Sequence, residues 1–337
     1  MNRFLANAAL CLAISNGGAP AQQPDKWRDS SSHTTSFVTV ASHVQLEILN
    51  WGGPGSGRSI VLLAGFGHTA HVFDTLAPKL SSTHRVYGIT RRGFGMSSAP
   101  ESGYTIQRLT DDLLAVLDEL KLDLPVLVGH SISGQEMSLI AAQHPKRIGG
   151  LVFLDAADND LPGRLKDPTL NKLLQLFPEP KPKPEDLRSF RDFLAWRKRQ
   201  FGVTPPESEL RNCYRMNPDG SVGNWRGADG VWEALTASAR KPDYISIAVP
   251  ALALFAAQRS ARDVPPWLET KDAVRLAALE KAYEFSIEQR TAARRAFLEG
   301  ASNRRVVELM GADHYMFLSN EADVVRVVLH FGSTLPN

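Results

Sequence analysis

Apolar residues are arranged along the chain in two alternating patterns. Short, largely apolar runs occupy positions 60–64, 86–89, 125–129, 151–154, 251–255 and 305–309. Runs of this length and composition predict strands that are buried on both faces of a parallel sheet. Apolar residues at helical spacing occupy the intervening stretches 106–120, 133–144, 272–298 and 321–329. The alternation predicts an α/β fold, with a mostly parallel central sheet and helices on both faces.

Two segments depart from this alternation. Residues 37–40 and 44–48 alternate between apolar and polar positions, which predicts a β-hairpin before the parallel strands. Residues 158–247 are too long for a loop and too irregular to extend the sheet. We expect them to form a helical cap inserted after the sixth strand. The core then comprises residues 37–157 and 248–337.

The composition of the amino-terminal residues differs from that of the rest of the chain. Arg3 precedes a mostly apolar run over residues 4–14, and small residues at 19–21 end in Ala21. This order predicts a secretory signal (residues 1–21) cut after Ala21, followed by a polar linker over residues 22–36. An exported protein, periplasmic or secreted, is therefore expected; without a working signal it would be cytoplasmic.

Composition excludes several classes of partner. The 337 residues carry 38 lysines and arginines against 36 acidic residues, so the formal charge of +2 gives no reason to expect nucleic acid. No internal run reaches the roughly 20 apolar residues that span a bilayer. Signal removal would leave Cys213 as the one cysteine, with no intrachain disulfide. Neither a Cys/His zinc spacing nor His-Glu-x-x-His occurs, so no metal and no cofactor is expected.

The sequence Gly129-His130-Ser131-Ile132-Ser133-Gly134 lies between a predicted strand and a predicted helix. A serine in such a sharp turn needs small neighbours two residues away on each side, a need met by Gly129 and Ser133. The helix start also presents backbone N–H groups to a developing negative charge. Ser131 is therefore the candidate nucleophile.

A serine hydroxyl needs a base, and histidine suits neutral pH. His314 follows the last predicted strand, in Met310-Gly311-Ala312-Asp313-His314, at the sheet edge where the Ser131 turn also lies. We therefore predict His314 as the base.

With these motifs the chain resembles the α/β-hydrolase fold family, from about residue 37 to the end apart from the cap. The resemblance implies the chain order nucleophile, acid, histidine. Its acid usually follows the strand after the cap, which favours Asp263; Asp155, at the end of strand 151–154, is the alternative. The acid would hold the imidazole tautomer and stabilise the imidazolium.

The resemblance also implies an oxyanion hole built partly from the loop after the first buried strand. We assign its donors to the backbone N–H groups of Phe66 and Ile132. Relatives that open epoxides generally carry an aspartate nucleophile, so a serine favours an acyl-enzyme route. Hydrolysis of a carboxylic ester or lactone is expected, with amide or C–C bond hydrolysis as the alternative. Cap tryptophans favour a small-molecule substrate with an apolar or aromatic group.

Two functions of other classes compete with this interpretation. Gly65-x-Gly67-x-x-Ala70 satisfies the dinucleotide fingerprint, and Arg91-Arg92 lies where a 2′-phosphate would be bound. An NADP-dependent oxidoreductase would use these residues but would leave Ser131 and His314 without a role. The second is a ligand-binding protein with a hydrolase fold but no catalysis, which would not need Ser131 or His314.

Overall fold

The computed structural model describes residues 27–55, 57–157, 161–299 and 301–335. The predicted signal segment, residues 1–21, lies outside these ranges. One eight-stranded sheet has the order β1-β2-β4-β3-β5-β6-β9-β10. The strands are β1 Thr34–Ala41, β2 Val44–Gly52, β3 Ile60–Leu63, β4 Val86–Ile89, β5 Val126–His130, β6 Gly150–Leu154, β9 Ala251–Ala257 and β10 Arg304–Met310.

The sheet is parallel from β4 to β10, and β1 and β2 join it antiparallel as a hairpin. This arrangement confirms the predicted α/β-hydrolase architecture. Because all parallel strands run the same way, the loops after β5, β6, β9 and β10 meet at one edge of the sheet, where ligand sites of open α/β sheets lie.

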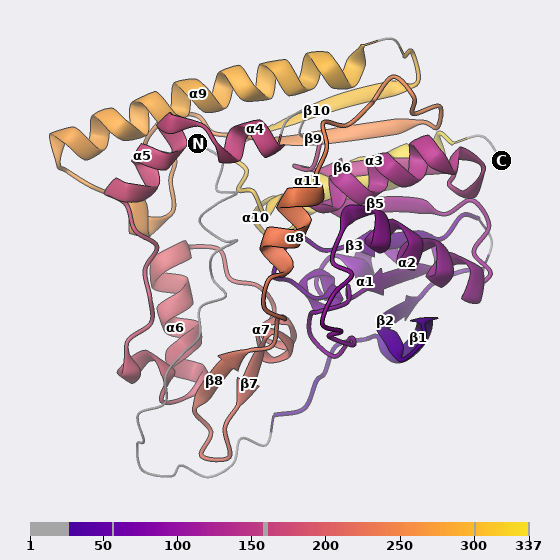
Figure 1. Ribbon diagram of the computed structural model, residues 1–337, viewed down its shortest axis with the longest axis horizontal. Coiled ribbons are helices and arrows are strands. Elements are labelled where there is room, and N and C mark those ends of the chain that lie inside the picture. Colours follow the sequence, from indigo (N-terminus) through magenta and orange to yellow (C-terminus); the bar gives the residue numbers. More distant parts are fainter. Residues whose placement is uncertain (1–26, 56, 158–160, 300, 336–337) are drawn as a thin grey trace.

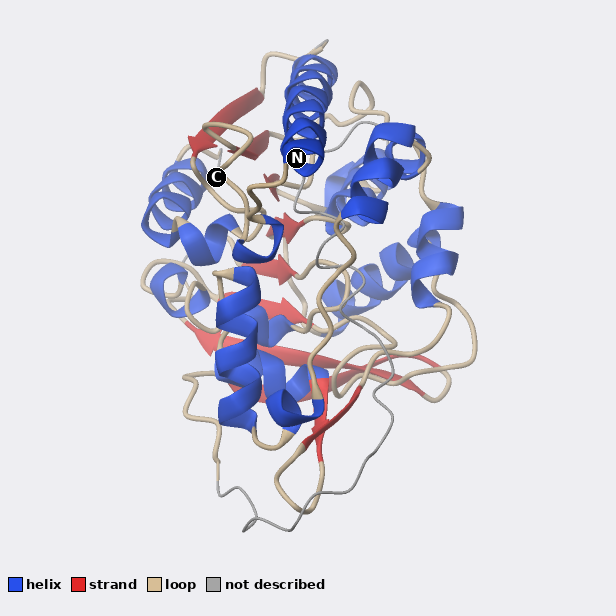
Figure 2. Ribbon diagram, turned by 90° about the vertical axis from the view of Figure 1, so that its left-hand side faces the viewer, coloured by secondary structure: helices blue, strands red, loops and turns tan. Residues whose placement is uncertain are grey.

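Helices cover both faces of the sheet, as Figure 2 shows. Alternate strand residues such as Val61, Leu127 and Phe153 pack against one set of helices: α2 Ile106–Glu119, α3 Ser133–Gln143 and α9 Ala273–Leu298. The intervening residues, such as Leu62 and Val128, pack against the other set: η1 Ala70–Phe73, α1 Ala77–Leu80, α10 Met316–Ser319 and α11 Glu321–Ser333. The strands are therefore buried on both faces, and this is why their sequences are almost entirely apolar.

The longest helix, α9, lies beside β9 and β10 in Figure 1. Its 26 residues include many arginines and glutamates, consistent with a partly solvated helix. Within the described ranges, no helix combines the length and apolar composition needed to cross a bilayer.

The chain between β6 and β9 forms an insertion, whose described part is residues 155–157 and 161–250. It contains α4 Leu161–Leu165, α5 Pro168–Leu176, η3 Pro184–Leu187, α6 Phe190–Phe201, α7 Glu207–Cys213, β7 Tyr214–Met216, β8 Val222–Trp225 and α8 Val231–Ser238. The insertion follows the sixth strand, as predicted, but it also holds a two-stranded antiparallel sheet. In Figure 1, α6, β7 and β8 form a lobe away from the main sheet.

The segment predicted as a linker over residues 22–36 is partly built into the fold. Strand β1 already begins at Thr34, which pairs with Asn50 of β2. Ahead of it, the Trp27 ring lies under the Arg211 guanidinium of α7, 4.9 Å from its centroid. The segment before β1 therefore contacts the fold through Trp27, and its last residues belong to the sheet.

Candidate active site

Ser131 occupies a strained turn between β5 and α3. Its φ is +59°, a left-handed value that is rare for residues other than glycine. Its amide donates to Leu154 O (3.3 Å), and its carbonyl accepts from Gly134 N–H (3.1 Å). The turn is thereby fixed to β6 on one side and to the helix start on the other, as expected of a nucleophile elbow.

Close packing explains the small residues around Ser131. A Cβ at Gly129 would lie 2.1 Å from Met137 Sδ, and a Cβ at Gly134 would lie 1.9 Å from Ala156 O. A Cβ at Gly65 would lie 3.2 Å from Ser131 Cβ. The loop after β3 therefore packs tightly against Ser131, and α3 packs against β5 and the segment after β6 too closely for a side chain at Gly129 or Gly134.

His314 lies in the loop after β10, and its imidazole is bound by Asp155. The distance from His314 Nδ1 to Asp155 Oδ2 is 2.7 Å, and both side chains are buried. Asp155 Oδ1 accepts from Ala256 N–H (3.1 Å), and its own amide donates to Leu254 O (2.8 Å). Because the carboxylate accepts at Nδ1, a neutral imidazole carries its proton there, and Nε2 is the basic nitrogen.

The structure differs from the preference for Asp263: among the described contacts it is Asp155, the alternative, that binds the His314 imidazole. Asp263 closes its own turn: Oδ2 accepts from Arg259 N–H (3.3 Å), and the backbone carbonyl accepts from Gln258 Nε2 (2.6 Å). The turn after β9 is long enough to carry Asp263 away from the strand end. Asp155 follows β6 directly, and its φ of +46° turns the carboxylate toward β9. The chain order nucleophile, acid, histidine is retained.

Phe66 and Ile132, the expected oxyanion donors, lie on the two segments that converge on Ser131. Within the described chain, neither backbone N–H donates to another backbone group. Arg91 links the two segments, because its guanidinium donates both to Ala64 O and to Glu136 of α3 (Nε to Oε1, 2.8 Å). The loop that carries Phe66 is thus held to the helix that follows Ile132.

The same contacts contradict the NADP interpretation. Arg91 is engaged as described, and Arg92 forms a bidentate pair with Asp112, at 2.5 and 2.7 Å. Both arginines are 4% exposed. Their charges are already neutralised inside the core, so they do not face a 2′-phosphate.

His130 is a site residue that the sequence did not single out. Its Nε2–H donates to His314 O (3.0 Å), and the two rings lie 4.4 Å apart between centroids. Burial, together with the nearby His314, holds the pKa of His130 well below its usual range, so the ring is neutral. His130 thereby fixes the histidine loop to the elbow. Its position directly before Ser131 was the sequence feature that could have identified it.

A buried hydrogen-bond network around His68 joins the core to the insertion. His68 Nδ1 lies 2.7 Å from Glu209 Oε1 of α7, and His68 Nε2 lies 2.9 Å from the Tyr315 hydroxyl. Glu209 also accepts from Thr69 N–H (3.1 Å) and Cys213 Sγ (3.0 Å). Burial alone would raise the Glu209 pKa, but the hydrogen bonds from His68, Thr69 and Cys213 hold it below its usual value. His68 is therefore a buried structural partner of the insertion rather than an exposed loop residue.

Aromatic side chains, two of them from the insertion, surround Phe66 in the loop after β3. The Phe66 ring lies 4.8 Å from Trp232, 5.6 Å from Phe94 and 6.5 Å from Trp225 between centroids. Ile132 belongs to the same apolar cluster. Trp225 and Trp232 are only partly buried, so they form an apolar surface beside the candidate oxyanion donors.

These features define a protein with an α/β-hydrolase sheet, a serine elbow after β5 and a histidine–aspartate pair that joins the loops after β10 and β6. The family model for the alpha/beta hydrolase fold matches residues 58–260. The chain belongs to this family.

Several relatives that the chain matches are named as hydrolases. The 2-(acetamidomethylene)succinate hydrolase of Mesorhizobium japonicum is 30% identical over 119 residues, which is 35% of this chain and 43% of that protein. The epoxide hydrolase of Caballeronia sordidicola is 23% identical over 309 residues, covering 83% and 89%. The chain spans 37–43% of the length of the curated relatives it matches first.

The sheet and its helices also superpose on solved hydrolases. The crystal structure of E-2-(acetamidomethylene)succinate hydrolase aligns with a TM-score of 0.61 at 19% identity, covering 89% of this chain and 98% of that one. At this identity the likeness concerns the fold.

Proposed function

We propose that this protein is a serine hydrolase that cleaves a carboxylic ester or lactone of apolar character through an acyl-enzyme intermediate. One observation carries the proposal. Ser131 stands in a strained elbow at the end of β5, and the His314–Asp155 pair stands at the same sheet edge. This combination of nucleophile, base and orienting acid is the one that acyl transfer requires.

In the first half of the reaction, His314 Nε2 removes the Ser131 Oγ proton as the oxygen attacks the ester carbonyl. The backbone N–H groups of Phe66 and Ile132 bind the resulting oxyanion. His314 then returns the proton to the alcohol oxygen as the C–O bond breaks, which leaves the acyl group on Ser131.

In the second half, His314 takes a proton from water as the hydroxide attacks the acyl carbon. Collapse of this intermediate releases the carboxylic acid and returns the proton to Ser131. Asp155 keeps the Nδ1 proton in place and stabilises the imidazolium in both halves, while remaining ionised itself.

The insertion is proposed to act as a cap that selects the substrate. Its Trp225 and Trp232 side chains lie beside Phe66, so an acyl or alcohol group placed there would meet aromatic surface. Burying each further CH₂ group contributes about 0.8 kcal/mol. Rates should therefore rise with the apolar size of the group.

A panel of p-nitrophenyl esters of increasing acyl length, together with simple lactones, tests the proposal. We expect turnover by the wild-type protein, rising kcat/KM from acetyl to longer acyl groups, and loss of turnover in Ser131→Ala. Trp232→Ala should flatten the dependence on acyl length while turnover of the acetyl ester persists. Binding without turnover would indicate a non-catalytic homologue, and unchanged turnover in Ser131→Ala would overturn the assignment.

A further inference from the structure

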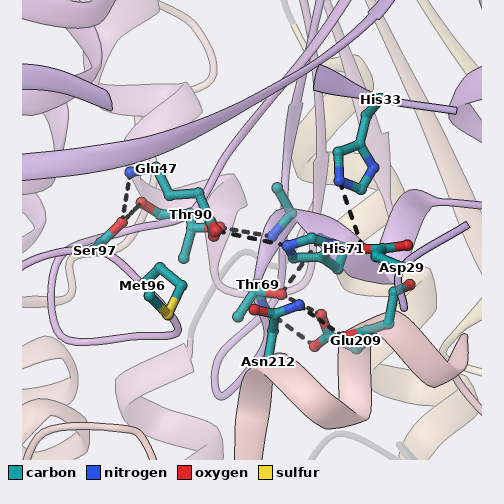
Figure 3. Close-up of polar contacts among 12 residues, drawn as sticks. Asp29, His33, Glu47, Thr69, His71, Thr90, Met96, Ser97, Glu209 and Asn212 are labelled. Atoms are coloured by element: carbon teal, nitrogen blue, oxygen red, sulfur yellow. Dashed lines mark hydrogen bonds and ion pairs between the residues drawn. The ribbon is translucent and has the colours of Figure 1, made fainter. Parts of the chain in front are cut away.

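Away from the elbow, two histidines and two aspartates converge where the N-terminal segment meets η1. Asp29 and His33 come from the segment before β1, and His71 and Asp74 from η1 and the residue after it. One nitrogen or carboxylate oxygen of each lies within 4.8 Å of the corresponding atom of every other. Figure 3 shows the His71 ring between Glu47 and Asp29, with His33 directed toward the same group.

The distances between these atoms suit a small divalent ion. Asp29 Oδ2 lies 3.7 Å from both His33 Nε2 and His71 Nδ1, and His71 Nδ1 lies 3.3 Å from Asp74 Oδ2. Metal–ligand bonds of about 2.0–2.2 Å in a tetrahedron place neighbouring ligand atoms roughly 3.3–3.6 Å apart. Small side-chain rotations suffice to close the set around one ion.

The surroundings resemble an outer shell of partners. His71 Nε2 lies 3.6 Å from Glu47 Oε1. If Nδ1 ligates the metal, the proton of the imidazole lies on Nε2 and faces the Glu47 carboxylate. Asp74 is oriented by Trp51 Nε1–H, which donates to Oδ1 at 3.1 Å, and by the Ser208 hydroxyl, which donates to Oδ2. Side chains of His33, His71 and Asp74 are at most 5% exposed, whereas Asp29 is 28% exposed and forms the entry side.

Charge also favours a cation at this place. Asp29, Asp74 and Glu47 bring three carboxylates together, and among the described residues their ion-pair partners are imidazoles, not lysine or arginine. Three carboxylates so close together concentrate negative charge in a largely buried place, which is costly unless a positive charge lies among them. A divalent ion would neutralise most of it.

We propose that Asp29, His33, His71 and Asp74 form a binding site for one divalent transition-metal ion, with Glu47 as outer-shell partner of His71. Two imidazole nitrogens and two carboxylate oxygens are a ligand set that suits Zn²⁺. The site is structural: it ties the N-terminal segment to η1 and, through Ser208, to helix α7 of the insertion.

The spacing rules applied to the sequence did not find these residues. Asp29-x₃-His33 and His71-x₂-Asp74 are two short pairs of mixed type, separated by 37 intervening positions. Neither pair matches a Cys/His zinc motif. Only the packing of the N-terminal segment on η1 brings the two pairs together.

A second cluster, His68, Glu209 and Cys213, also brings possible ligands together. Its members are hydrogen-bonded through Glu209, to His68 and to Cys213, much as His33 and His71 are bonded to Asp74 in the first cluster. Because this cluster contains a thiol, it serves as an internal comparison for the experiment.

The test measures metal binding by the full-length protein without a histidine tag. After dialysis against a chelator, Zn²⁺ or Co²⁺ is added back, and bound metal is measured by plasma mass spectrometry. We expect about one ion per chain and a rise in Tm on adding Zn²⁺. His71→Gln, His33→Gln and Asp29→Asn should each weaken binding by more than about tenfold and reduce the Tm rise. His330→Gln, on the exposed end of α11, and Cys213→Ser should bind as the wild type does.

The Co²⁺ spectrum distinguishes the two clusters. The proposed site predicts visible bands without a thiolate-to-cobalt charge-transfer band. Should His71→Gln fail to unfold cooperatively, Asp29→Asn at the solvent-facing side decides the matter. The proposal is overturned if no metal binds, if Asp29→Asn and His33→Gln bind as the wild type does, or if binding is lost in Cys213→Ser.

Discussion

Two residues at the ends of neighbouring strands have backbone angles that side chains rarely tolerate. Ser131 after β5 and Asp155 after β6 have φ values of +59° and +46°. Such positions cost about 1–3 kcal/mol each unless the surrounding structure fixes them. Here both amides are bound to carbonyls of the adjoining strand. Two of the five described non-glycine residues with positive φ are thus the candidate nucleophile and the partner of His314, where orientation matters for chemistry.

Single substitutions test directly whether Asp155 is the acid that orients His314. Asp155→Asn would place an amide against His314 Nδ1 and favour the tautomer with its proton on Nε2, so kcat should fall by about 10³–10⁴-fold. Asp263→Asn is the matched control, because Asp263 closes a turn and does not hold the imidazole; its kcat should stay within about twofold of wild type. Ester hydrolysis by both variants gives the answer. A large loss in Asp263→Asn with activity retained in Asp155→Asn would reverse the assignment.

The strands and helices could be predicted from the sequence where their burial produces a regular pattern of apolar residues. Runs such as 60–64 and 151–154 are apolar because strands β3 and β6 are covered on both faces. Strands β7 and β8 were missed because each is short and belongs to a small separate sheet. The choice between Asp155 and Asp263 depends on where the turn after β9 goes, and turn length alone does not give that path.

One buried ion pair connects the segments that carry the candidate oxyanion donors, Phe66 and Ile132. Arg91, after β4, bonds to Ala64 O after β3 and to Glu136 in α3, and both side chains are at most 5% exposed. Arg91→Met would leave Glu136 buried and unpaired, which costs about 3–5 kcal/mol of unfolding free energy. Urea unfolding measures this loss.

The control for Arg91 is a surface pair on α11. Arg326 and Asp323 are 69% and 49% exposed, so Arg326→Met should change the unfolding free energy by less than about 1 kcal/mol. The double variant Arg91→Met/Glu136→Gln should recover part of the stability, because the unpaired charge is gone. Equal effects of Arg91→Met and Arg326→Met would contradict this role.

For the whole molecule, the insertion contributes a pH dependence of stability. Burial raises the pKa of Glu179 to about 8, and the nearby Arg197 only partly offsets it. The ordinary value is 4.5. Between these values the folded chain retains a proton that the unfolded chain releases, so this group's stabilising contribution is full below pH 4.5 and is lost as pH rises toward 8.

Glu179→Gln should therefore stabilise the protein above about pH 8, by a few kcal/mol at about 1.4 kcal/mol per pKa unit, and much less at about pH 5. Unfolding free energies at the two pH values check this difference. Glu185→Gln, at a side chain that is 55% exposed, serves as control. If Glu179→Gln were no more stable than wild type at the higher pH, the carboxyl group would not be protonated in the folded state.

The central claim is that Ser131 is a nucleophile activated by His314. The most direct measurement is intact-mass analysis after treatment with a fluorophosphonate probe. We expect a single adduct on wild-type protein that maps to Ser131, no adduct on Ser131→Ala, and strongly slowed labelling of His314→Ala. Ser133→Ala, which removes a hydroxyl that donates to His130 O three residues earlier, should label as wild type. Labelling that persists in Ser131→Ala and disappears in Ser133→Ala would contradict the account.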